Sequence, residues 1–157
     1  MGLFKSETIV TPNIIGVTDG TLGTPFGTGE YVGSAVAVGS AVSLTTGTPA
    51  NVITLTLTPG DWDLEGNCNY TGTGTTVAAG GYFTSGISLV SATLPTDGSE
   101  VPELIGAITT TNFRSGTQFC RKRVSVTTTT KVYLVASATF SAGTVGAYGT
   151  LNARRER

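Results

Sequence analysis

Apolar and polar residues alternate with a period of two along much of this chain, as they do in β-strands with one buried and one exposed face. Residues 61–70 show this pattern most clearly. One face of the segment carries acids and amides, and the other carries Trp62, Leu64, Cys68 and Tyr70. The pattern predicts a half-buried strand, in which Trp62, Leu64 and Tyr70 are core anchors.

Short segments of the same kind follow one another along the chain and are separated by glycine, proline and polar residues. These further segments are residues 31–38, 41–46, 51–58, 82–93, 104–110, 119–127, 131–140 and 144–153. In residues 82–93, the side chains of Phe83, Ile87 and Leu89 are expected to share one face. Tyr133 and Phe140 are two more expected core anchors.

The regions between these segments are interpreted as loops, of which residues 72–81 and 95–102 are the longest. No window has the period of a helix of useful length. About eight short strands with turn signals between them are typical of an antiparallel sandwich or barrel. We therefore predict an all-β fold, and eight strands fit a jelly-roll sandwich.

Composition supports one β-rich domain. Of the 157 residues, 39% are hydrophobic and 12% are charged. A chain of this length can bury roughly 70% of its unfolded surface around one core. Threonine and valine dominate the periodic segments, and β-branched side chains suit a pleated surface better than a helix. The 22 glycines and 6 prolines recur between the segments, where turns need them.

The first 29 residues lack the alternation. They carry short apolar patches spaced by proline and glycine, and these patches contain Ile9, Val10, Ile14, Ile15 and Phe26. An apolar arm in water is unfavourable, so we expect it to lie along a neighbouring subunit or a partner surface. The chain is thus predicted to consist of an extended attachment arm, residues 1–29, and one domain, residues 30–157.

Charge argues against a nucleic-acid partner, and hydropathy argues against membrane insertion. Nine basic and ten acidic residues give a net charge of −1, with no basic stripe for a phosphate backbone, so we expect no nucleic-acid partner. No run of 18 apolar residues and no signal-like amino terminus occurs. We expect a soluble chain made in the cytoplasm, with no membrane insertion.

The two cysteines, Cys68 and Cys120, would close a loop of about 50 residues, worth roughly 4 kcal/mol, if they were bonded. A packed pair of thiols is favoured over a disulfide, because nothing marks the chain for an oxidising compartment. The sequence contains no histidine, so two thiols alone cannot form a standard structural zinc site. No cofactor is expected.

Candidate catalytic chemistry is sparse. Without histidine, Ser-His-Asp and Cys-His arrangements are impossible, and we predict that the protein is not an enzyme. Asp61, Asp63 and Glu65 project from one strand face and are interpreted as a solvated face. Two alternatives remain: a calcium site that also uses Asn67, or a carboxylate pair for glycoside hydrolysis, although the spacing is not specific to either.

Two further features have a structural and a functional interpretation. Trp62 lies between two aspartates, where it could stack on a sugar ring, but its phase with Leu64 favours a core position. In the run of residues 121–123, Arg-Lys-Arg, the middle side chain must point opposite to its neighbours in a strand. A charge facing inward there predicts either pairing with an acid or a subunit interface.

Five stretches of the sequence resemble a module that is common in tailed bacteriophages and prophages. They are GEYV (29–32), VSLTTGTPANV (42–52), LTPGDWDLEGN (57–67), TTTKVYLVA (128–136) and GAYGTLNARRER (146–157). The module is similar to the knob at the tips of tail fibres and tail needles. The resemblance implies a homotrimeric jelly roll like the tumour-necrosis-factor fold.

A fibre tip follows a long shaft, whereas only about 29 residues without heptads precede the domain here. This favours a capsid decoration (cement) or head-fibre protein on the virion surface, with the major capsid protein as partner of the arm. The alternative is a tail fibre or tail-tip protein that attaches to a tail protein and adheres to a host surface glycan or protein. The loops at residues 72–81 and 95–103 are then the candidates for glycan binding.

Overall fold

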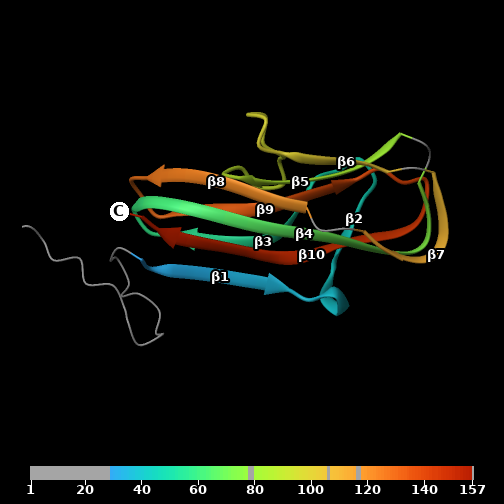
Figure 1. Cartoon of the computed structure of the whole chain (residues 1–157), viewed down its shortest axis with the longest axis horizontal. Helices are drawn as coiled ribbons and strands as arrows, with labels where there is room; N and C mark the ends of the chain where they lie inside the picture. The colour runs from blue at the N-terminus through green and yellow to red at the C-terminus, as the bar shows by residue number, and fades with distance from the viewer. Residues whose placement is uncertain (1–28, 78–79, 106, 116–117, 157) are drawn as a thin grey trace, which may run out of the picture.

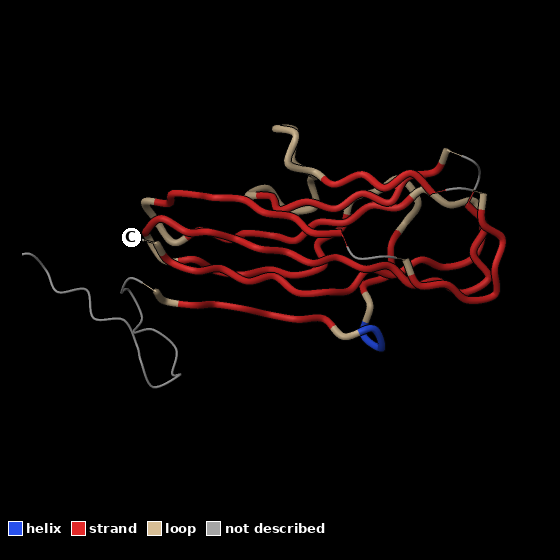
Figure 2. Tube along the Cα trace, viewed as in Figure 1, coloured by secondary structure: helices blue, strands red, loops and turns tan. Residues whose placement is uncertain are grey.

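The computed structural model describes residues 29–156 except 78–79, 106 and 116–117 (Figure 1). The five apolar residues of the predicted arm, Ile9, Val10, Ile14, Ile15 and Phe26, lie outside the described residues. The described part is an all-β protein, in which a single 3-10 turn, η1 (Val38–Ser40), is the one helical element (Figure 2). No described helix is long and apolar enough to cross a membrane.

In the described part of the chain, ten strands form two antiparallel sheets. Sheet A contains β1 (Tyr31–Val36), β2 (Val42–Leu44), β4 (Gly60–Val77), β7 (Ile108–Arg114), β8 (Gln118–Val126) and β10 (Ala142–Arg155). Sheet B contains β3 (Ala50–Leu57), β5 (Gly81–Ser88), β6 (Val101–Ile105) and β9 (Thr130–Ala138). One continuous apolar core includes residues of both sheets, an arrangement compatible with a β-sandwich.

The order of strands in sheet A is β1–β10–β4–β7, and β2 and β8 join it as partners of β10 and β4. One edge is therefore shared by β1 and β2, and the other edge by β8 and β7. In sheet B the order is β3–β9–β5–β6. Figure 1 shows β1 starting at the end of the molecule where β10 finishes, with β7 at the far end.

The predicted loop at residues 72–81 is wrong in its first half, because β4 continues to Val77. Gly72 is not a turn residue here. A Cβ at this position would lie 2.2 Å from the Phe113 ring of β7, so the glycine permits close packing of neighbouring strands. The buried Thr75 hydroxyl donates a hydrogen bond to the Thr144 carbonyl of β10. The added part of β4 is rich in β-branched residues, which suit a strand.

Two other strand predictions are corrected. The single strand expected at residues 104–110 is divided between β6 and β7, which belong to different sheets. The strand expected at residues 82–93 ends at Ser88, and Leu89 is 45% exposed instead of sharing the core face with Phe83 and Ile87. Residues 29–156, apart from the gaps given above, thus contain ten strands, where the sequence pattern predicted about eight.

The alternation of residues 61–70 is confirmed: Trp62, Leu64 and Tyr70 are fully buried. Phe140 is half-buried and packs against the core. Tyr133 is also half-buried but does not belong to the core, since the alternation of β9 directs its neighbours Val132 and Leu134 inward.

Buried polar side chains link the two sheets inside the core. The Tyr70 hydroxyl of β4 donates to the Thr84 carbonyl of β5 at 2.8 Å. The Gln118 amide of β8 donates to the Phe83 carbonyl at 2.9 Å and accepts a hydrogen bond from the Ser85 hydroxyl at 2.7 Å. Because each group finds a partner in the opposite sheet, the network also restricts how the sheets can slide.

Cys68 and Cys120 are both buried and unbonded. Cys68 lies opposite Gln118 in the register of β4 and β8, and Cys120 lies opposite Gly66. The two cysteines are therefore diagonal neighbours, whose Cα atoms are typically about 7–8 Å apart, beyond the usual reach of a disulfide. Burial raises the pKa of the Cys68 thiol to about 12.

Candidate functional site

The outer face of sheet A presents its side chains in rows that cross the strands. The register of β1, β10, β4 and β8 aligns one residue of each strand in every row. The first row is Tyr31, Arg154, Asp63 and Arg123, the second is Gly33, Asn152, Glu65 and Arg121, and the third is Ala35, Thr150, Asn67 and Phe119. The face is thus charged in its first two rows and uncharged in the third.

The charged end is internally paired. Arg123 donates two hydrogen bonds to the Asp61 carboxylate, at 2.6 and 3.1 Å, and Arg121 donates to Asp63 at 2.8 Å. The hydrogen bond to Asp61 raises the pKa of the Arg123 guanidinium, and the one to Asp63 has the same effect on Arg121. The acidic strand face is therefore occupied by arginines of the neighbouring strand.

Lys122 points away from its two arginine neighbours, as the strand alternation predicted. Its amine lies 2.7 Å from the carboxylate of Asp97, in the loop between β5 and β6. The hydrogen bond from Lys122, together with hydrogen bonds from the hydroxyl and the backbone amide of Ser99, holds the pKa of Asp97 well below its usual range. The ion pair connects an edge of sheet A to a loop of sheet B. Of the two alternatives given for this charge in the sequence analysis, the structure shows pairing with an acid.

Beyond the charged rows, the same face is hollowed. A hollow of about 400 Å³, here called the Tyr148 hollow, lies over β10 and β4 beside the end of β1. Its lining consists of residues 35–38 together with Asn67, Asn69, Arg114, Tyr148, Gly149 and Thr150. The Asn69 amide donates to Oδ1 of Asn67 at 2.9 Å. The lining combines an aromatic ring, amides, two hydroxyls and one guanidinium, with no carboxylate.

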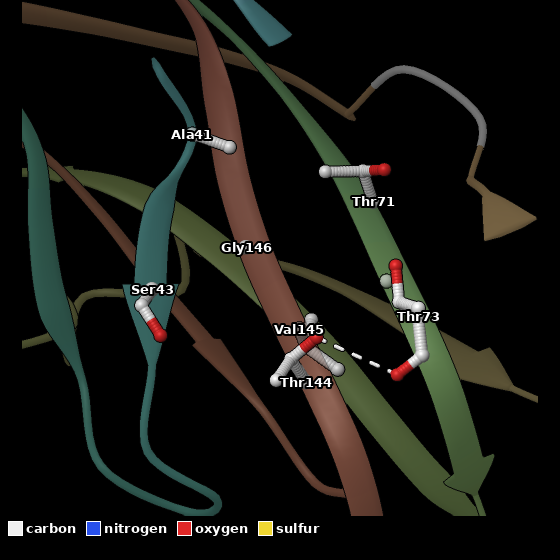
Figure 3. Close-up of a pocket in the computed structure, with 8 residues that line it drawn as sticks. Ala41, Ser43, Thr71, Thr73, Thr144, Val145 and Gly146 are labelled. Atoms are coloured by element: carbon white, nitrogen blue, oxygen red, sulfur yellow. Dashed lines mark hydrogen bonds between the residues drawn. The ribbon is translucent and has the colours of Figure 1, made fainter. Parts of the chain in front are cut away.

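A second and smaller hollow of about 190 Å³, the Thr73 hollow, lies further along β10 and β4 (Figure 3). Figure 3 shows Ala41 and Ser43 on one side of β10 and Thr71 and Thr73 on the other. Its threonine hydroxyls are already used: Thr71 donates to the Phe113 carbonyl, at 3.2 Å. Thr73 and Thr144 also bond within the sheet, to Asn112 at 3.2 Å and to the Thr73 carbonyl at 3.5 Å.

Backbone features explain why this part of the face is concave. Gly146 contributes no side chain to the row between Ser43 and Thr71. The edge strand is also interrupted at η1, between β1 and β2, so residues 35–38 form a wall beside β10. The hollows therefore result from a missing side chain and a break in the edge strand.

The outer face of sheet B has a different cover. Pro95, in the loop between β5 and β6, lies against Gly86 so closely that a Cβ on the glycine would be 2.6 Å from the proline ring. Gly86 pairs with Val135 of β9, and Val135 is fully buried although it lies on the opposite face from the core residues Leu134 and Ala136. The loop thus covers the centre of this face.

A buried arginine closes one end of the molecule. Arg155, the last residue of β10, is 4% exposed, and its guanidinium lies 2.9 Å from the Glu30 carboxylate. It also donates to the carbonyl of Pro59 and the hydroxyl of Thr58. Its Cζ atom lies 4.4 Å from the centre of the Trp62 ring, within cation–π range. We call this group the Arg155 clasp.

The clasp holds the point where the predicted arm meets the domain. The Gly29 amide donates to the Arg155 carbonyl at 2.9 Å, and the Arg155 amide donates to the Glu30 carbonyl at 2.8 Å. Sequence analysis missed this role and treated the basic C-terminus as part of the resemblance only. The available signal was the phase of β10, which places Arg155 on the same face as Leu151 and Ala153.

The structure also decides between the two interpretations of Trp62. Its ring is fully buried and its indole N–H donates to the Thr58 carbonyl at 2.9 Å, so the ring is not accessible to a sugar. The predicted glycan loops do not line the Tyr148 hollow. Sequence analysis did not single out Arg114, Asn69 or Tyr148, whose outward phase in their strands was the only local signal.

Among the described residues, no group of three or more His, Cys, Asp or Glu side chains is placed to hold a metal ion. No protein-family model matches the chain, and the searches of curated proteins and of solved structures found no match either.

Proposed function

We propose that this protein is a non-catalytic structural protein of a tailed-phage virion, a capsid decoration or head-fibre protein that displays a trimeric knob. The proposal starts from the resemblance of five stretches of the chain to phage knob modules. The observation that carries it further is the Arg155 clasp. It ties Gly29 and Glu30, the first two described residues, to the end of β10, which supports one end of the domain as the attachment point for the predicted arm.

The proposed jelly roll is supported by the pairing of the strands. Counted along the chain, the ten strands occupy eight positions, since β1 and β2 share one edge and β7 and β8 another. The first position pairs with the eighth (β10), the second (β3) with the seventh (β9), and the third (β4) with the sixth. The fourth (β5) pairs with the fifth (β6). Such nested pairing is that of one long hairpin wound into two sheets.

The proposed homotrimer is supported by aromatic side chains at the two edges of the outer face of sheet A. Tyr31 of β1 is 43% exposed and Phe119 of β8 is 64% exposed. A closed ring forms from contacts between two different patches of each subunit. We propose that the β8 edge of one copy contacts the β1 edge of the next, which leaves the centre of the face accessible.

The oligomer has a direct test. Light scattering after size-exclusion chromatography should give three times the 16.0 kDa mass of the chain. Phe119→Ser should shift the protein towards monomer, whereas Tyr82→Ser, which removes another exposed aromatic side chain, on β5 of sheet B, should leave the trimer unchanged. A monomeric wild-type protein would contradict the trimer.

The virion role is tested by counting copies. Quantitative mass spectrometry of purified particles, with the major capsid protein as internal standard, should give hundreds of copies per virion for a decoration protein. Absence from the particle would contradict the proposal. Deletion of residues 1–29 should abolish attachment to the virion without unfolding the domain.

The Tyr148 hollow favours a second candidate function, adhesion of a tail fibre or tail tip to a host surface glycan. Its aromatic ring, amides and guanidinium are groups that bind polar ligands on protein surfaces. A count of a few to a few tens of copies per virion would favour this function over decoration. In that case, deletion of residues 1–29 should leave glycan binding intact.

A further inference from the structure

We propose that the Tyr148 hollow binds a carboxylated sugar, of the uronic or sialic acid class, with Arg114 as the carboxylate-binding residue. The identification of such a sugar as a host-surface component rests on the proposed function. The binding chemistry itself rests only on the residues of the hollow. At about 400 Å³, the hollow lies at the lower end of the range of ligand pockets, which suits one or two sugar rings.

The charge of the hollow selects the ligand. Arg121, Arg123 and Arg155 each form an ion pair with a carboxylate of this chain. Arg114 has no such pair among the described residues, and no acidic side chain lines the hollow. The planar fork of a guanidinium matches a carboxylate in geometry, so an anionic ligand with a carboxylate group suits this position.

The neutral lining suits the rest of a sugar. The hydrogen bond from Asn69 occupies Oδ1 of Asn67 and so orients the Asn67 amide, whose N–H groups have no partner among the described residues. The half-buried Tyr148 adds an aromatic surface with a hydroxyl, and Thr150 adds a second hydroxyl. Amides and hydroxyls bind sugar hydroxyls, and an aromatic ring covers the apolar face of a pyranose.

The other concave and exposed regions are weaker candidates. The Thr73 hollow has less than half the volume, and the hydroxyls of its threonines already bond to the protein. No charged residue lines it. The exposed apolar pair Leu89 and Val90 offers no hydrogen-bonding groups in its side chains. Of these regions of the described residues, only the Tyr148 hollow combines an unpaired cation, an oriented amide and an aromatic ring.

The test is a titration of the full-length protein with sodium D-glucuronate, D-galacturonate and N-acetylneuraminate, followed by NMR. D-Glucose and D-galactose serve as neutral counterparts, and acetate as a carboxylate without a ring. We expect at least one acidic sugar to bind saturably with a Kd of about 1–10 mM, and its neutral counterpart and acetate to bind at least about tenfold more weakly. The shifted resonances should include those of Tyr148, Asn67 and Arg114.

Variants identify the residue that is responsible. Arg114→Gln should weaken binding at least about tenfold, and Arg114→Lys should weaken it less, since the lysine keeps the charge and loses the fork. Arg121→Gln is the matched control, because Arg121 lies on the same outer face but is paired with Asp63. Its expected effect is less than about twofold. Melting temperatures of all variants show whether the fold is retained.

Three results would overturn the proposal. One is the absence of saturable binding of all three acidic sugars at about 50 mM. Another is equal binding of acetate or of the neutral sugars, which would show that the hollow does not require both the ring and the carboxylate. The third is unchanged binding by a folded Arg114→Gln variant. The virion role fails separately, in the copy count and in the mass of the oligomer, neither of which depends on sugar binding.

Discussion

The two faces of sheet A are built from the same strands and have opposite properties. On β10, Arg155 faces inward and is 4% exposed, whereas the preceding Arg154 faces outward and is exposed. On β4, Trp62 and Leu64 face inward, and the neighbouring acids Asp61 and Asp63 pair with arginines at the surface. We therefore expect a residue's effect on stability to depend more on whether its side chain faces the core or the solvent than on its type. Four predictions test this difference.

The largest effect is expected at the Arg155 clasp. Arg155→Ala should lower the free energy of unfolding by about 3–5 kcal/mol, because it leaves the Glu30 carboxylate without its buried partner and removes bonds to Thr58 and Pro59. Urea denaturation measures the change. The control is Arg154→Ala on the outer face, which should leave stability nearly unchanged. Equal losses in both variants would show that the two faces do not differ.

The glycines of β10 provide the second test. A Cβ at Gly149, where φ is +154°, would lie 1.8 Å from the Asn67 carbonyl oxygen in the backbone of the neighbouring strand β4. Gly149→Ala should therefore lower the free energy of unfolding by about 2–3 kcal/mol through strand displacement. Gly146 faces outward, and its nearest contact would be the Ala41 Cβ at 3.0 Å. Gly146→Ala should have a smaller effect in the same denaturation assay, and an equal effect would contradict the packing argument.

The third prediction concerns pH. Burial raises the pKa of the Cys68 thiol from 9.0 to about 12, so the folded state favours the neutral thiol. This contribution is complete below pH 9.0 and is lost as pH rises towards 12. From pH 8 to pH 10, the free energy of unfolding should fall by about 1 kcal/mol, measured by urea denaturation.

Cys68→Ala should reduce that pH dependence, since it removes one of the two thiols that burial holds neutral; burial also raises the pKa of the Cys120 thiol, which remains in the variant. In the native protein at pH 8, neither cysteine should react with a thiol reagent on the timescale of an unfolded control, because both are buried. Rapid labelling of the native protein would contradict the burial of the two thiols.

The smallest effect is expected at the exposed ion pairs. Arg123→Ala breaks the pair with Asp61 on the outer face. Because the Arg123 side chain is 55% exposed, solvent weakens the pair, and the change in unfolding midpoint should be close to the measurement error and should decrease further as salt is added. A loss comparable to that of Arg155→Ala would show that the outer face is covered in solution, as in an assembly that extends beyond the edges.

Some strands could be predicted from the alternation of apolar and polar residues within the strand itself. Residues 61–70 and 51–58 were predicted correctly as strands, including the inward phase of Trp62, because a strand with one buried face shows a period of two. The same reasoning anticipated that Lys122 would turn away from Arg121 and Arg123.

The candidate site was not accessible to such reasoning. The residues of the Tyr148 hollow come from β4, β7, β10, the end of β1 and the segment that follows it, and nothing local links Arg114 to Tyr148. The partner of Arg155 was equally hidden, since Glu30 is 125 residues away in the sequence.

The sequence by itself determined that the protein is rich in β-strands and which side of the clearest strands faces the core, because side-chain period and β-branched composition are local properties. Only the tertiary structure decided that Gly72 packs against Phe113 instead of making a turn, that the segment after Val101 is divided between two sheets, and that one outer face is covered by Pro95 while the other is open. The physical reason is that hydrogen bonds between strands, close backbone contacts and concave surfaces join residues far apart in the chain, and no local pattern specifies their partners.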